Sequence, residues 1–203
     1  MIEISSKIIE KYNVSKDSMG KIEAVKSWDL EFLTSAFNDN LIRAGRAYSV
    51  EQVYPIISKF GKADYEIAKL LEVEFKKFVV LTLIRTGVPH APSGAIDMYW
   101  HFFILHTKDY INFCEKVWGN FEGDPRFRHH YPANDDTRPG MLNAYIETLK
   151  LYKEVFGEPR LYEGVGFSPI EVWTAESKTS GDSYSGIIDP SIYKDFGINP
   201  KFK

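Results

Sequence analysis

The sequence predicts a mainly α-helical protein: a compact multi-helix domain with a long irregular loop and an extended C-terminal tail. Apolar residues recur at the 3.6-residue helical period through much of the chain up to Gly157. Two segments, residues 119–140 and the end of the chain from about residue 174, are instead rich in Gly, Pro, Ser, Asn and Asp. A length of 203 residues suits one domain. We therefore expect a helical domain in residues 1–173 and a tail in residues 174–203.

The first third of the chain predicts helices joined by polar turns. The stretch from Trp28 carries aromatic and aliphatic residues at helical spacing and stops at Gly45, and Ser49 with Gln52 forms the pattern of a capping box. A long helix follows, at about residues 62–86, and ends before Gly87. This long helix should form the centre of the domain.

A second central helix is expected from about Gly94 to Trp118, with Ser93 as its N-cap. At 100° per residue, one stripe of apolar residues lies within about 60° of Trp100. Cys114 and Trp118 belong to this stripe and are therefore expected to be structural core residues, like Trp100 itself. After the loop at 119–140, a last amphipathic helix ends at Gly157, and any strands would be short and lie in the final third.

Composition excludes several classes of protein. A net charge of -3, without clustered basic residues, gives no reason to expect nucleic-acid binding. The longest apolar stretch, Phe78 to Ile84, is far below the roughly 20 residues that span a bilayer. A single cysteine and the lack of a secretory signal pattern indicate a cytoplasmic protein with no membrane association. Glycine-rich phosphate loops and the serine-hydrolase and zinc-protease motifs are absent from the sequence.

Asp97 and His101 are the best candidates for chemistry. They lie four residues, or roughly 6 Å of helical rise, apart, so they can contact each other or share one ion. In the loop, His129 and His130 are adjacent, and only one of them is expected to face the helix. Asp97, His101 and one loop histidine would suit a divalent metal, zinc or iron, with an open position. The alternative is that these side chains only fasten the loop to the helix.

The same residues carry a resemblance. The stretch "IDMYWHFFILHTKDYINFCEKVWGNF" followed by "RHHYP" resembles the glycine-rich domain-containing-protein-like family, a domain of unknown function. The positions that match its pattern are Asp97, Trp100, His101, Thr107, Tyr110, Cys114, Gly119, His129, His130 and Pro132. Members often continue into a glycine-rich tail, which this chain replaces with the polar segment from about residue 174. The resemblance implies a site at these residues and brings no established activity.

Two functions follow from these observations. The first is a metal-binding or catalytic site at Asp97, His101 and the His-His loop, with Arg128 or Tyr110 contacting a substrate. The second is a non-catalytic interaction or assembly protein, whose tail docks on a protein partner or on a neighbouring subunit of a homo-oligomer. The sequence leaves both open.

Overall fold

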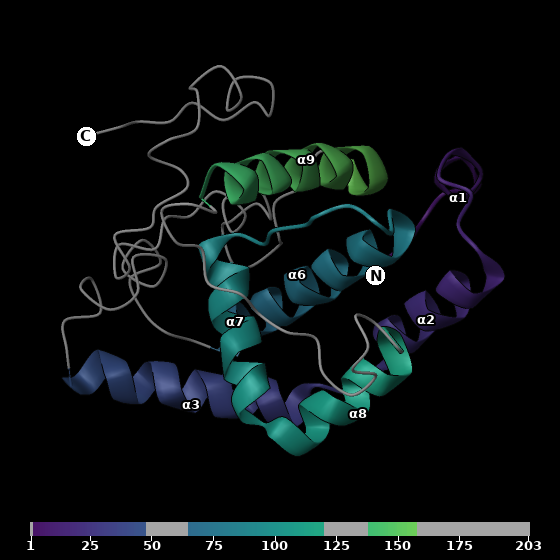
Figure 1. The fold of residues 1–203 in the computed structure, drawn as a ribbon. Helices are drawn as coiled ribbons and strands as arrows, with labels where there is room; N and C mark the ends of the chain where they lie inside the picture. Colours follow the sequence, from purple (N-terminus) through teal and green to yellow (C-terminus); the bar gives the residue numbers. More distant parts are fainter. Residues whose placement is uncertain (1, 48–64, 120–137, 158–203) are drawn as a thin grey trace.

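The computed structural model describes residues 2–47, 65–119 and 138–157, and these ranges are mostly helical (Figure 1). Their helices are α1 (Ser6–Lys11), α2 (Lys16–Ser27), α3 (Glu31–Ala47), α6 (Tyr65–Ile84), α7 (Gly94–Leu105), α8 (Thr107–Val117) and α9 (Arg138–Phe156). No strand occurs within the described ranges. The prediction of a mainly α fold is therefore confirmed. The predicted capping box at Ser49 and the tail at 174–203 lie outside the described residues.

Helix α6 lies at the centre of the fold and contacts α2, α3, α7 and α9 (Figure 1). Its apolar side chains are buried almost all the way round the helix, as expected of a helix covered by neighbours on several sides. Those that are at most 2% exposed are Ala68, Leu70, Leu71, Phe75, Phe78, Val79, Val80 and Leu81. The long helix predicted at 62–86 is thus the core helix, observed from Tyr65 to Ile84.

Two helix boundaries lie where the sequence predicts them: the start of α7 and the end of α9. The Ser93 side chain accepts a hydrogen bond from the Ile96 amide at 3.3 Å, which fixes the start of α7. Gly157 adopts a φ of 75°, a left-handed conformation that ends α9 and that other residues adopt only with strain.

The predicted helix from Gly94 to Trp118 is wrong in one respect, because it is two helices. The chain breaks at His106, whose φ of -86° and ψ of 61° end α7 and begin α8. The bend brings Trp100 Nε1 within 3.0 Å of the Tyr110 hydroxyl, to which it donates a hydrogen bond. In a straight helix these residues would be about 15 Å apart along the axis. The break at His106 allows the aromatic rings of α7 and those of α8 to be buried in the same core, although the sequence has no Pro or Gly at this position.

A second difference concerns the helix expected to begin near Trp28. Trp28 is instead the C-cap of α2, in extended conformation, and α3 starts at Glu31. The Asp29 carboxylate accepts a hydrogen bond from the Glu31 amide at 2.9 Å, so a local side-chain bond replaces the helical one at this turn. None of the described helices is both long and apolar enough to cross a bilayer.

Candidate functional site

Asp97 and His101 contact each other on the first two turns of α7. The His101 Nδ1 atom lies 2.8 Å from the Asp97 carbonyl oxygen and 3.2 Å from the carboxylate oxygen Oδ2. The His101 side chain is 51% exposed and that of Asp97 is 31% exposed, so solvent reaches the pair. The hydrogen bond that His101 donates to the Asp97 carboxylate raises the pKa of His101, and the partial burial of the ring opposes this effect.

This geometry shows which nitrogen of the His101 ring Asp97 contacts. The backbone carbonyl oxygen and the carboxylate Oδ2 of Asp97 both accept from Nδ1 of His101. They therefore hold the proton on Nδ1 and fix the orientation of the ring. With the proton on Nδ1, Nε2 is the ring nitrogen that carries the lone pair. Asp97 therefore orients the imidazole in this structure, and its role as a metal ligand stays a prediction.

The histidines of the loop, which complete the predicted ligand set, stay a prediction. His129 and His130, together with Arg128, lie outside the described residues. Within residues 2–47, 65–119 and 138–157, no three His, Cys, Asp or Glu side chains are grouped closely enough to hold a metal ion. A complete metal site at His101 would thus need ligands from the remainder of the chain.

The other residues singled out from the sequence lie in the core. Tyr110 is fully buried and accepts the hydrogen bond from Trp100, so its described contacts stabilise the bend between α7 and α8. Trp118 is 9% exposed, and its indole nitrogen donates to Thr82 at 3.1 Å. Cys114 is buried on α8. The substrate contact suggested for Tyr110 stays a prediction, which would require this buried hydroxyl to become accessible.

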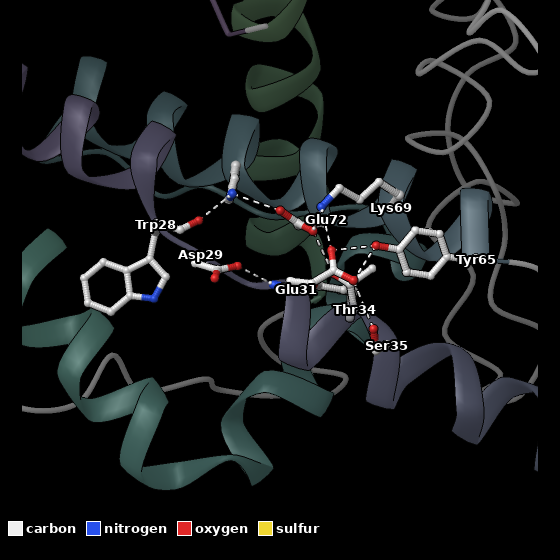
Figure 2. Close-up of polar contacts among 10 residues, drawn as sticks. Trp28, Asp29, Glu31, Thr34, Ser35, Tyr65, Lys69 and Glu72 are labelled. Carbon is white, nitrogen blue, oxygen red and sulfur yellow. Dashed lines mark hydrogen bonds and ion pairs between the residues drawn. The ribbon is translucent and has the colours of Figure 1, made fainter.

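Sequence reasoning missed a buried polar network centred on Glu72 of α6 (Figure 2). The Glu72 carboxylate accepts hydrogen bonds from Lys69 at 2.8 Å, from Lys76 at 2.9 Å and from Thr34 at 2.7 Å. Thr34 Oγ1 also lies 3.0 Å from the Tyr99 hydroxyl, so helices α3, α6 and α7 meet at this carboxylate.

The burial and pairing of the Glu72 network indicate that it stabilises the packing of the helices. Burial pushes the pKa of Glu72 upward, but the hydrogen bonds from Lys69, Lys76 and Thr34 outweigh this effect and hold the pKa below its usual value. Glu72 is 4% exposed, and Lys76 is also bonded to the Trp28 carbonyl at 2.7 Å. Charged groups that are buried and fully paired stabilise a particular packing of helices and leave little access for a substrate.

A second buried carboxylate lies two residues further along α6. Glu74 is completely buried and accepts hydrogen bonds from Lys77 at 2.8 Å and from the Tyr152 hydroxyl at 2.9 Å. This contact joins α6 to α9. The stretch "LLEVEF" contains both carboxylates within an apolar run, and that pattern could have indicated them, because an unpaired carboxylate is rarely buried.

The described residues also form a cleft that the sequence did not indicate. It has a volume of about 170 Å³ and lies between the end of α6 with the following turn and one face of α9. Its lining residues are Arg85, Val88, Pro89, His90, Gly140, Asn143, Ala144 and Glu147. They come from segments at least 50 positions apart, so no local pattern could have found the cleft.

Comparison with known proteins identifies a family and corrects the resemblance drawn from the sequence. No curated protein and no solved structure matches the chain. The family model that does match is described as UCP032817-like, and it covers residues 37–144. The glycine-rich domain-containing-protein-like resemblance is therefore wrong, since the motif at Asp97 and His101 lies within the range matched by a different model. With more than half of its length matched, the chain belongs to the uncharacterised UCP032817-like family.

Proposed function

We propose that this protein binds a divalent metal ion, zinc or iron, through Nε2 of His101, with His129 or His130 as a further ligand. The observation that carries the proposal is that Nδ1 of His101 contacts two oxygens of Asp97, one from its backbone carbonyl and one from its carboxylate. Histidines that ligate metals commonly donate their other ring nitrogen to a carboxylate or a carbonyl, which orients the ring and increases its basicity. Here one residue supplies both acceptors.

The chemistry of the site follows from the ligand set. A metal held by two or three protein ligands with an open position lowers the pKa of bound water and polarises a substrate oxygen. Exposure of about half of the His101 side chain supports access from solvent. Arg128 could then bind an anionic group of a substrate, and the proposal places the protein in the cytoplasm, where the reducing conditions suit its one buried cysteine.

The test is metal content by plasma mass spectrometry on the untagged full-length protein, purified and then reconstituted with zinc or iron(II). We expect near-stoichiometric metal in the wild type and its loss in His101→Ala. We also expect Asp97→Asn to weaken metal affinity by about 10- to 100-fold, because the carboxylate orients the ring.

His106→Ala is the matched control, because His106 lies one residue beyond α7 and its ring packs against Phe32 and Phe102. This variant should keep its metal. Equal metal content in wild type and in folded His101→Ala, or no metal uptake by the wild type, would exclude the site. Separate His129→Ala and His130→Ala variants identify the loop ligand.

A second candidate is a non-catalytic assembly protein, favoured by an exposed apolar corner where α7 meets α8. Leu105 is 75% exposed, and the neighbouring His106 ring contacts Phe32, which is itself 42% exposed. Such a corner could be covered by a second copy of the chain, with the tail at 174–203 extending the contact. Sedimentation velocity should then show concentration-dependent dimers that Leu105→Ser dissociates, whereas a monomer at all concentrations would exclude this self-association.

A further inference from the structure

The cleft between α9 and the segment that follows α6 has the shape and charge of a small-molecule site. In Figure 1 the chain leaving α6 runs back along α9 before it enters α7. This run is fixed to α9 by a hydrogen bond from the Ala91 amide to the buried Thr148 hydroxyl, at 3.2 Å. Its own turn is closed by His90, whose Nε2 donates to the Arg85 carbonyl at 2.8 Å. Both walls of the cleft are therefore held in place by hydrogen bonds.

Two of the α9 residues that line the cleft have little side-chain volume. Gly140 and Ala144 lie one helical turn apart on this face, and a Cβ atom built at Gly140 would meet nothing within 4 Å. Val88 and Pro89 form the opposite apolar wall. An apolar cavity of about 150 Å³ can hold a benzene molecule. The 170 Å³ observed here thus suits one aromatic ring or a short branched chain.

Charge at the edge of the cleft indicates the polar group of the ligand. Arg85 lines the cleft, and in the described part of the chain its ion-pair partner is Glu147, at a long N···O distance of 3.6 Å. Glu147 is more closely bound by Lys150, at 2.8 Å, and this contact is the main reason that the pKa of Glu147 is lowered. Two cations thus share the Glu147 carboxylate, and the Arg85 guanidinium has further N–H donors that can bind another anion.

We propose that this cleft binds a small carboxylic acid with an apolar body, whose carboxylate pairs with Arg85 and whose apolar part lies between α9 and the turn at Val88 and Pro89. This site is separate in residues from the proposed metal site at His101. A ligand of this size in a cleft open to solvent should bind with a Kd on the order of 1 mM.

Sodium benzoate and benzyl alcohol test the proposal, because they share a ring and differ in charge. Amide NMR spectra of the full-length protein should show saturable shifts at Val88, Asn143 and Ala144 with benzoate, and about tenfold weaker binding of benzyl alcohol. Arg85→Gln should weaken benzoate binding to the level of the alcohol and leave alcohol binding unchanged.

Filling the cleft is the second arm of the test. Gly140→Leu adds a side chain where the structure has open space, so the protein should fold and bind both probes at least about tenfold more weakly. Gly20→Leu on α2 is the matched control, since its Cβ also meets nothing within 4 Å, and it should bind as wild type. Shifts that do not saturate, or that survive Gly140→Leu, would overturn the site. Equal affinity for both probes, unaffected by Arg85→Gln, would overturn the carboxylate as the ligand group.

Discussion

Replacing Glu72 with Gln tests whether the buried network stabilises the fold. The side chains of Glu72 and Lys76 are 5% and 11% exposed, and their charged groups lie 2.9 Å apart. Gln retains the shape of Glu and one acceptor oxygen, but it loses the charge and can turn an NH₂ group toward an ammonium donor. Leaving one partner of a buried ion pair uncompensated costs about 3–5 kcal/mol. This is a large part of the roughly 5–15 kcal/mol by which a domain is stable.

Urea unfolding followed by circular dichroism measures this cost. With a slope of about 1–3 kcal/mol per molar urea, a loss of 3–5 kcal/mol should lower the midpoint by at least about 1 M. Glu66→Gln is the control, because Glu66 lies on the same helix and is exposed, and it should change stability by no more than about 0.5 kcal/mol. The double variant Glu72→Gln/Lys76→Met removes the uncompensated charge and should regain much of the lost stability.

The difference between wild type and Glu72→Gln should also depend on pH. Because the folded-state pKa of Glu72 is lowered, its contribution is fully present above the unfolded-state pKa, about 4.3, and disappears as the pH falls through the folded-state value. A Glu72→Gln protein as stable at neutral pH as the Glu66→Gln control would refute the structural role of the network.

Four further variants test the site, the core and two glycine positions. Asp97→Asn should lower the pKa of His101, measured by NMR of the ring protons, because the carboxylate that raises it is removed. Phe103→Ala should cost about 3–5 kcal/mol in urea unfolding, because the ring is fully buried where α7 meets the core. Gly20→Ala should stabilise α2 by about 0.5–1 kcal/mol, whereas Gly157→Ala should destabilise the protein by about 1 kcal/mol, because Gly157 has a positive φ and Gly20 does not.

Each of these variants has an outcome that contradicts its reasoning. An unchanged His101 titration in folded Asp97→Asn would show that Asp97 does not control the imidazole in solution. A loss below about 1 kcal/mol in Phe103→Ala would mean that the ring is not in a packed core. Equal effects of the two glycine substitutions would be inconsistent with a left-handed residue at the end of α9.

The candidate site was predictable in part. The four-residue spacing of Asp97 and His101 predicts a contact on one helix, and the structure has that contact. Spacing alone left open whether Asp97 shares an ion with His101 or orients its ring. Which ring nitrogen faces the carboxylate is a rotamer property, so the orientation of the His101 ring required side-chain coordinates.

The amino-acid sequence determined most of the helical segments and the core helix, because these depend on local periodicity and caps. Its glycine stops were correct at Gly157 and wrong at Gly45, which lies inside α3. The sequence did not determine the break at His106, which has no local signal and depends on the burial of rings from α7 and α8 on the same core. The same holds for the Glu72 network, which joins Thr34 of α3 and Tyr99 of α7 through contacts between residues far apart in the chain. Only tertiary packing decides such contacts, because it brings distant side chains together and removes water from between them.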